Sequence, residues 1–472
     1  MLNKVIWLLA GRWVYNIITL ISFFIIINEI GQISYGIYAI AAVFLIFVDM
    51  FFVDGIEAAI IRQKGNRDNV VKMALLVVMI CSALLTFLIV ILAFLWREIY
   101  DSNEVFYVVL SISSLVLFYG INSVFRGCLI RDHNTKSVST IQSLACLVGA
   151  LSGIYSAQHG GEYWSLIIQQ GVFIFISCIS LAFSSQIKWK SCVDYSVFKE
   201  IFRFVKYSFF TTVLNVFTNR LDVLIIGSVF GLAQAGIYAF AKRIVQIVQD
   251  IFASAFDKVL VSMMRVSECS KKEKRAYELA VFGQSALLFP AFIGLAFLSD
   301  GFLSLFFNNI WDESAVFLSC MIVGGIFRAM VTLERAVQVT SGAIRTILKV
   351  RVQELLVALL LFSPVYLSEN ISPLYIAVIF SVRQLFGYLL VIKSHSSDKF
   401  FANLNHVKQL VTIPFIATMI MMLSIVLLSY FLNQESWYNL VLITVFSGTA
   451  YSLVMWFSKS RWLEQYFGKG DA

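Results

Sequence analysis

The chain has 472 residues, of which 60% are hydrophobic and only 14% are charged. A soluble domain carries roughly 25% charged residues, so the composition excludes an ordinary water-soluble protein. The formal net charge is +8, and its meaning depends on where the basic residues lie.

Apolar runs of about 20 residues, long enough to cross a bilayer as helices, recur along the whole chain. The fourteen predicted spans lie at residues 6–27, 37–61, 73–96, 105–125, 138–157, 164–185, 207–230, 237–260, 278–298, 314–340, 351–367, 374–392, 409–432 and 438–457. The eighth and tenth spans are the most polar, so the predicted number of membrane spans is twelve to fourteen. No A-x-A cleavage site follows the first span, so we expect it to be retained rather than removed as a signal peptide. The predicted fold class is an all-α polytopic membrane protein.

The connections between these spans differ in charge from one side to the other. Alternate connections, together with Lys4, hold 27 of the 36 basic residues, whereas the opposite connections hold only Arg97. This asymmetry follows the positive-inside rule, which places basic connections in the cytoplasm. With an even number of spans, both termini are then cytoplasmic. We interpret the net charge as a consequence of topology and expect no nucleic-acid partner.

A short motif occurs twice at a distance of 200 positions. Residues 35–41 read YGIYAIA, residues 235–241 read AGIYAFA, and Gly31 has a counterpart in Gly231. The copies open the second and eighth spans, so they share one orientation, as in a parallel internal repeat. This predicts two pseudo-symmetric six-helix lobes. The expected division is an N-lobe at 1–186, an interfacial linker at 187–206, a C-lobe at 207–392, and a C-terminal helix pair with a cytoplasmic tail at 393–472.

The linker has apolar residues at every fourth position, with basic residues off that stripe. The stripe consists of Trp189, Val193, Val197, Ile201 and Val205. This spacing predicts an amphipathic helix on the cytoplasmic leaflet. A solvated basic loop is the alternative.

Several spans carry charged residues, which cost about 2.5–3.5 kcal/mol each at mid-bilayer and therefore usually face a protein interior or a wet cavity. Four spans place polar residues on one helical face. These stripes are Arg12, Asn16 and Thr19; Asn215, Asn219 and Asp222; Lys242, Gln246, Gln249, Asp250, Ala253 and Asp257; and Arg328, Thr332 and Arg335. We expect them to line a cavity between the lobes. Internal ion pairs, such as Arg335 with Glu334, are the alternative.

The cations within spans suit an anionic ligand, because Arg12 and Arg328 have no acidic neighbour on their own helix and arginine matches phosphate in bidentate geometry. The candidate binding residues are Arg12, Asn16, Asn215, Asn219, Arg220, Lys242, Arg243, Arg328 and Arg335. The four histidines form no cluster with ligand spacing and no P-loop occurs, so we expect no metal, no cofactor and no ATP site.

Three features together carry a family resemblance. They are the G-x-Y-A turn in both lobes, "GGEYWSLIIQQ" at Gly160–Gln170, and "RGCLIRDHNTKS" after the fourth span. With these motifs the chain resembles bacterial polysaccharide lipid flippases of the Wzx type, in the multidrug/oligosaccharidyl-lipid/polysaccharide (MOP) superfamily. The resemblance covers nearly the whole chain. It implies two lobes around a cavity lined by spans one, two, seven and eight.

The resemblance also implies the function. The expected substrate is an undecaprenyl-diphosphate-linked oligosaccharide, moved from the cytoplasmic to the periplasmic leaflet by alternating access, for O-antigen, capsule or exopolysaccharide synthesis. The protein would act as a monomer in the bacterial inner membrane, beside the polymerase and chain-length regulator of that pathway. Candidate residues for binding a coupling proton or Na⁺ are Asp49, Glu57, Asp222, Asp250 and Asp257.

Two other functions are weighed against this one. A membrane polysaccharide polymerase needs a substantial periplasmic loop, whereas the longest outside connection here, Ser299–Asp312, has about fourteen residues and no histidine. We therefore expect that the protein is not an enzyme. A drug/cation antiporter of the same superfamily would use acidic cavity residues such as Asp49, Asp222 and Asp250. The surplus of cations within the spans argues against it.

Overall fold

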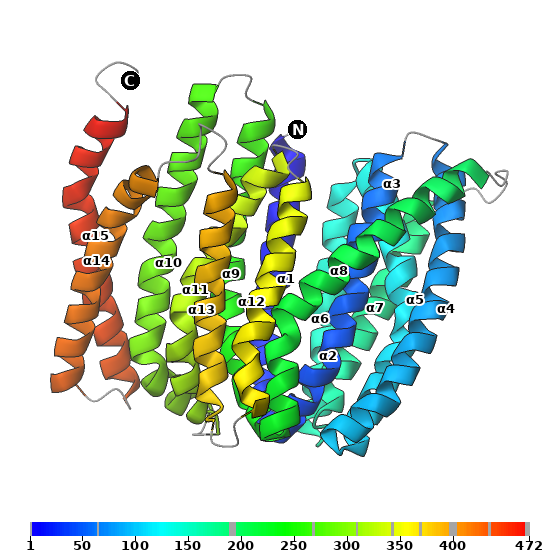
Figure 1. Ribbon diagram of the computed structural model, residues 1–472, viewed down its shortest axis with the longest axis horizontal. Coiled ribbons are helices and arrows are strands. Elements are labelled where there is room, and N and C mark those ends of the chain that lie inside the picture. Colours follow the sequence, from blue (N-terminus) through cyan, green and yellow to red (C-terminus); the bar gives the residue numbers. More distant parts are fainter. Residues whose placement is uncertain are drawn as a thin grey trace. The chain divides into compact units, whose positions relative to one another are not determined.

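The computed structural model describes residues 2–63, 66–187, 195–266, 270–307, 310–340, 344–367, 371–395, 404–432 and 436–467 (Figure 1). Its helices are α1 (Leu2–Glu29), α2 (Gln32–Phe52), the π-helix η1 (Val53–Glu57), α3 (Ala58–Arg62), α4 (Arg67–Tyr100), α5 (Asn103–Arg131), α6 (Thr135–Gln158), α7 (Trp164–Ser185), α8 (Tyr195–Phe230), α9 (Leu232–Val266), α10 (Ser270–Phe307), α11 (Glu313–Thr340), α12 (Ile344–Leu367), α13 (Leu374–His395), α14 (Leu404–Phe431) and α15 (Trp437–Phe467). Because α2, η1 and α3 are contiguous, the described residues form 14 helical segments.

Most of these segments can cross a membrane. Within the described residues, 12 helices are long and apolar enough to do so, which makes the chain a multi-pass membrane protein and confirms the all-α fold class. The two other segments correspond to the first and eighth predicted spans. The apolar part of α1 described by the structure is only Trp13–Glu29, and α9 carries the longest of the polar stripes noted in the sequence.

The chain divides by packing into two compact units, Met1–Ala239 and Phe240–Ala472. In the first unit, α6 packs against α1 and α7, and α5 packs against α2, α4 and α7. Helix α8 lies obliquely across this unit and contacts α2, α4 and η1 (Figure 1). By packing, therefore, the first helix of the predicted C-lobe belongs with the first six spans. The division into six-helix lobes stays a prediction.

The second half of the predicted linker is the beginning of α8, in one continuous helix with the seventh span. Ile201 and Val205 are buried, whereas Lys199 and Arg203 are exposed, so this part of the helix is amphipathic. Val205 lies over Gly55 of η1, where a methyl group would be 3.7 Å from its Cγ2. Residues 188–194 lie outside the described residues, and the interfacial location remains a prediction.

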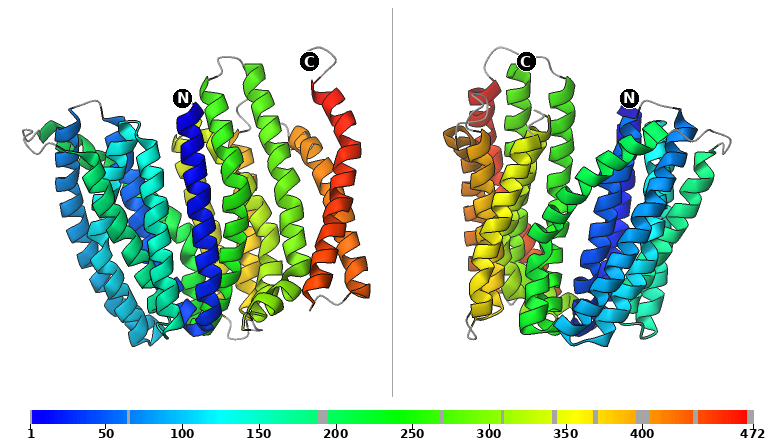
Figure 2. Two further views of the ribbon diagram at one scale, coloured as in Figure 1. Left: turned by 180° about the vertical axis from the view of Figure 1, so that it is seen from behind. Right: turned by 45° about the vertical axis from the view of Figure 1, so that its right-hand side comes forward.

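The second unit is built around α10, α11 and α13. Helix α13 packs between α11 and α12, and α10 packs against α11 and α14. The pair α14–α15 lies beside α10 (Figure 2), where Met421, Ile425 and Ile443 form a buried apolar cluster. The last two helices are therefore attached to the second unit through α10.

The repeated motif begins two helices in the same way. The amide of Tyr35 donates to the carbonyl of Gly31, and that of Ala235 donates to the carbonyl of Gly231, both at 3.1 Å. Gly231 has a φ of +88°, which favours glycine. Both α2 and α9 therefore start directly after a glycine.

The second glycine of each copy brings these two helices together. A methyl group on Gly36 would lie 1.9 Å from the carbonyl oxygen of Leu232, and one on Gly236 would lie 2.0 Å from the carbonyl oxygen of Gln32. Real Cβ atoms essentially never come closer than 3.0 Å to such an atom. The first turns of α2 and α9 therefore cross backbone to backbone, at a point that only glycine fits.

Candidate functional site

The acidic residues of the second span lie in or near an irregular turn of the helix. The backbone forms a π-helix at Val53–Glu57, a feature that is frequent at functional sites. Glu57 Oε2 accepts a hydrogen bond from Arg126 Nε of α5 at 2.5 Å, and both side chains are largely buried. The charge of Arg126 also acts on Asp49, while Asp54 is exposed. The predicted coupling residues Asp49 and Glu57 therefore share one internal cation.

The polar stripe of α8 is divided between two environments. The side-chain amide of Asn219 donates to the carbonyl oxygen and to Oδ1 of Asn215, both at 2.8 Å. Asn215, Asn219 and Arg220 are partly exposed. Asp222 is only 2% exposed and accepts a 2.6 Å hydrogen bond from the hydroxyl of Tyr238, the tyrosine of the second motif copy. In this structure Asp222 therefore joins α8 to α9.

The stripe of α1 is described in part. Asn16 is partly exposed, and the hydroxyl of Thr19 donates back to the carbonyl of Tyr15 at 2.8 Å. The side chain of Arg12 lies outside the described residues, so its role as an anion ligand stays a prediction.

The long stripe of α9 does not stay on one open face. Lys242 is 1% exposed, and its Nζ lies 5.6 Å from the centre of the Phe380 ring, a cation–π contact. Gln249 is buried and donates to the carbonyl of Gly325 at 2.7 Å. Arg243 is partly exposed and Asp250 is exposed, whereas the side chain of Asp257 lies outside the described residues. Lys242 and Gln249 therefore make contacts inside the second unit.

Arginine 335 of α11 pairs with a carboxylate that the sequence did not indicate. Its Nη2 donates to both oxygens of Glu354 on α12, at 2.5 and 2.7 Å. The neighbouring Glu334, which the ion-pair alternative assigned to Arg335, accepts a hydrogen bond from the Tyr277 hydroxyl of α10. Arg328 is partly exposed. The partner of Arg335 comes from another helix, which spacing along α11 could not reveal.

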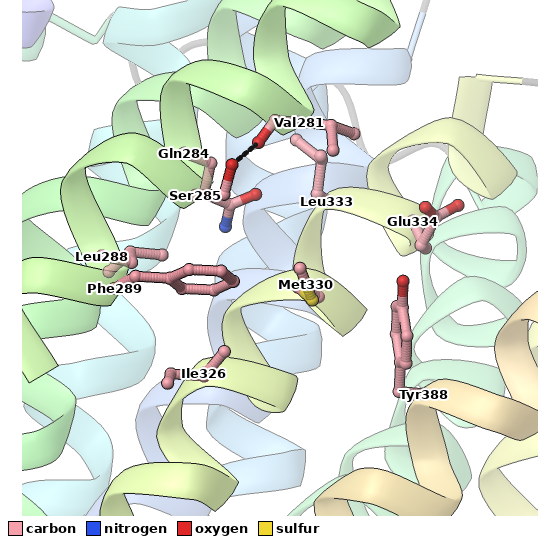
Figure 3. A pocket seen from close by; sticks show the side chains of 10 residues that line it. All are labelled: Val281, Gln284, Ser285, Leu288, Phe289, Ile326, Met330, Leu333, Glu334 and Tyr388. Carbon is pink, nitrogen blue, oxygen red and sulfur yellow. Dashed lines mark hydrogen bonds between the residues drawn. The ribbon is translucent and has the colours of Figure 1, made fainter. Parts of the chain in front are cut away.

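A small cavity lies beside Glu334, between α10, α11 and α13 (Figure 3). It measures about 10 Å³, room for roughly one water molecule. Its walls are largely apolar, and Gln284, Ser285, Glu334 and Tyr388 supply the polar groups. In Figure 3 the hydroxyl of Tyr388 points toward Glu334. The cavity is too small for a sugar or a diphosphate. Across the described ranges, no three His, Cys, Asp or Glu side chains gather so as to hold a metal ion.

Comparison with known proteins identifies the family. Residues 30–316 match the family described as "Polysaccharide biosynthesis protein", which is more than half of the chain. The chain belongs to this family. No curated protein sequence matches the chain.

Solved structures show the same fold at low sequence identity. A lipid II flippase, MurJ, in an inward closed conformation superimposes with a TM-score of 0.74 at 16% identity, covering 94% of this chain and 99% of MurJ. An inward-facing multidrug resistance transporter of the MATE family gives 0.59 at 16% identity, covering 81% and 94%. A MOP superfamily transporter from Pyrococcus furiosus gives 0.54 at 15% identity, covering 84% and 95%. The chain therefore has the fold of MOP transporters, as the sequence motifs predicted.

Proposed function

We propose that the protein is a flippase that moves undecaprenyl-diphosphate-linked oligosaccharides across the bacterial inner membrane, from the cytoplasmic to the periplasmic leaflet, by alternating access. The observation that carries the proposal is the match to the polysaccharide biosynthesis family over residues 30–316. A lipid II flippase has the same fold, which supports it. Both termini would be cytoplasmic, and the protein would act as a monomer beside the polymerase and chain-length regulator of surface polysaccharide synthesis.

The charges within the helices suit this substrate. Arg220, Arg243 and Arg328 are partly exposed, so each can reach a ligand while remaining on a helix. A diphosphate would take up charge-assisted hydrogen bonds from such groups, while the isoprenoid chain stays in the lipid. Outward movement of a negative head group also follows an inside-negative membrane potential, by about 2.3 kcal/mol per charge per 100 mV.

The test uses purified protein in phospholipid vesicles that contain a fluorescent undecaprenyl-diphosphate sugar. Flipping exposes the sugar to an impermeant quencher on the opposite side of the vesicle. We expect Arg220→Ala and Arg328→Ala to slow quenching at least tenfold, because each removes a cation from the substrate path. Arg97→Ala removes an exposed arginine at the end of α4 and should leave the rate unchanged. Quenching no faster than in protein-free vesicles would contradict the proposal, whereas equal rates in all three variants and the parent would contradict only the role of these arginines.

The acids of the first unit favour a second candidate, a drug/cation antiporter. Glu57 pairs with Arg126, whose charge also acts on Asp49, so two acids share this cation, and MATE transporters share the fold. In the same vesicles, an imposed proton gradient should then drive uptake of a fluorescent organic cation. Uptake of that cation without sugar-lipid flipping would select the antiporter.

A further inference from the structure

Three helices of the second unit meet around a buried apolar cluster. Val331 of α11, Val350 of α12 and Val391 of α13 are all at most 4% exposed and pack together. This cluster fixes the positions of charged side chains one residue or one helical turn away. Arg335 follows Val331 by four residues, and Arg351 follows Val350 directly. The polar groups near the cluster are therefore held by rigid helices rather than by loops.

Glu354 is the carboxylate at the centre of these charges. It receives two hydrogen bonds from Arg335, and Arg351 Nη1 lies 3.7 Å from its Oε2. Gly387 of α13 gives it room, since a methyl group there would lie 3.0 Å from Glu354 Oε1. The side chains of Arg335 and Arg351 remain about a fifth exposed, so neither is fully enclosed by protein.

The surrounding charge is strongly positive. Arg335, Arg328 and Arg383 all act on Arg351 as like charges, and Glu354 acts on it as the opposing charge. Glu334, the other acid of α11 nearby, is engaged by the hydroxyl of Tyr277. Among the described residues, Arg335 and Arg351 pair with the same carboxylate, Glu354. A surplus of cations in an apolar surrounding is unfavourable unless an anion compensates it.

Arg383 of α13 is the most deeply buried of these arginines. It is 4% exposed, and its guanidinium carbon lies 5.9 Å from the centre of the Phe380 ring. Its Nη2 is buried and has no hydrogen-bond partner among the described residues. Buried donors of this kind are normally satisfied by protein, water or a ligand. Arg351 pairs with Glu354 three residues further along α12, but the sequence could not show that Arg335 and Arg383 of other helices act on it.

We propose that Arg335, Arg351 and Arg383 form a binding site for a phosphoryl anion between α11, α12 and α13. Arginine forks match phosphate oxygens in pairs, and a diphosphate carries enough negative charge to balance the surplus. Glu354 holds the arginines in place while the site is empty and competes with the anion for them. The identity of the anion as the diphosphate of the transported lipid rests on the proposed function. The existence of the site does not rest on it.

The test measures binding to the purified full-length protein in an uncharged detergent by titration calorimetry. The probes are inorganic pyrophosphate, a short-chain prenyl diphosphate and phosphatidylglycerol. The variants are Arg351→Gln, Arg383→Gln and Glu354→Gln. Arg67→Gln is the matched control, because Arg67 also pairs with a carboxylate, Asp132, but lies in the first unit.

We expect Arg351→Gln and Arg383→Gln to weaken pyrophosphate binding at least tenfold, and Arg67→Gln to change it less than twofold. Glu354→Gln should bind pyrophosphate at least as tightly as the parent, because it frees two guanidinium groups. A purely structural network predicts the opposite, since Glu354→Gln would then only disturb the helices. Should Arg383→Gln fail to fold, Arg351→Lys replaces it, because it keeps the charge but loses the fork and should still weaken binding.

The site is refuted if the parent does not bind pyrophosphate, or if Arg351→Gln binds it within twofold of the parent. Tighter binding of prenyl diphosphate than of pyrophosphate identifies the transported lipid as the source of the anion. Displacement of pyrophosphate by phosphatidylglycerol identifies a membrane lipid head group. If pyrophosphate binds in the expected pattern while the vesicle assay shows no flipping, the site stands and the proposed function fails.

Discussion

The crossing of α2 and α9 gives a prediction that can be calculated from the structure. A Cβ on Gly36 would lie 1.9 Å from the carbonyl oxygen of Leu232, whereas an ordinary contact begins at 3.4 Å. Gly36→Ala must therefore move the two helices apart by about 1.5 Å, the difference of these distances. Overpacking of this kind costs about 1–3 kcal/mol. The ratio of molecules with the helices in contact to molecules with the helices separated should then fall roughly 5- to 150-fold.

The assay follows a buried position beside the crossing. Ala239 is 8% exposed and shares the face of α9 that carries Leu232 and Gly236, so a cysteine there reacts with a water-soluble maleimide mainly when the helices separate. We expect Gly36→Ala to raise the reaction rate of an Ala239→Cys thiol by that same 5- to 150-fold, because the rate follows the open population. Gly31→Ala is the matched control, since a methyl group on Gly31 meets nothing within 4 Å, and its φ of −77° suits alanine.

A double variant provides a second check on the same geometry. Gly236→Ala should act like Gly36→Ala, because its methyl group would lie 2.0 Å from the carbonyl oxygen of Gln32. The two substitutions separate the same pair of helices, so their combined effect should be smaller than the product of the single effects. The reasoning is refuted if Gly36→Ala labels no faster than Gly31→Ala, or if the two effects simply multiply.

Three further predictions concern ion pairing, hydrogen bonding and topology. Glu57→Gln should lower the free energy of unfolding by about 3–5 kcal/mol, because it leaves Arg126 buried without its carboxylate. In chemical denaturation, adding Arg126→Gln should recover most of this loss, and an unrecovered loss would contradict the pairing. Tyr238→Phe should lower the free energy of unfolding by about 1–3 kcal/mol in the same measurement, because the buried carboxylate of Asp222 loses its donor. An unchanged denaturation midpoint would contradict a stabilising role for this hydrogen bond. In intact cells, a cysteine at Gln158 should react with an impermeant thiol reagent and one at Lys271 should not, and the reverse labelling would overturn the predicted orientation.

The sequence predicted the helices better than their contacts. Apolar length indicated the spans, and the repeated glycines marked where α2 and α9 begin, because both signals are local. The partner of Arg335 could not be predicted in this way. Its neighbour Glu334 is adjacent in sequence but turns to Tyr277, while Glu354 reaches Arg335 from the next helix. Which acid meets which cation depends on how the helices pack, and that information is not contained in the period of any one of them.

Lys242 shows the same limit for a polar stripe. Its spacing on α9 indicated a face lining a cavity, yet the side chain is buried against the ring of Phe380. Periodicity identifies which residues share a face, but it does not tell whether that face meets water, lipid or another helix. Arg351 stands at the very start of the predicted span 351–367, whereas α12 begins at Ile344 and carries it inside the helix. Helix ends are set by capping and packing as well as by hydrophobicity, so a boundary drawn from apolar runs can displace a charge by several residues.

The π-helix at Val53–Glu57 also says something about the history of this segment. A π turn is equivalent to one extra residue within an α-helix, so a single codon deletion within Val53–Glu57 could restore regular winding. Because the extra residue widens only this one turn, such a deletion should leave Arg62 at the end of α3, whose guanidinium carbon lies 5.6 Å from the centre of the Phe204 ring, close to its present position. A residue lost from a regular turn would instead rotate the residues after it by about 100° and shift them by about 1.5 Å along the axis. A library of single-residue deletions would therefore separate a harmless insertion, which any deletion within the π turn repairs, from an insertion retained because it orients the side chains of the turn itself.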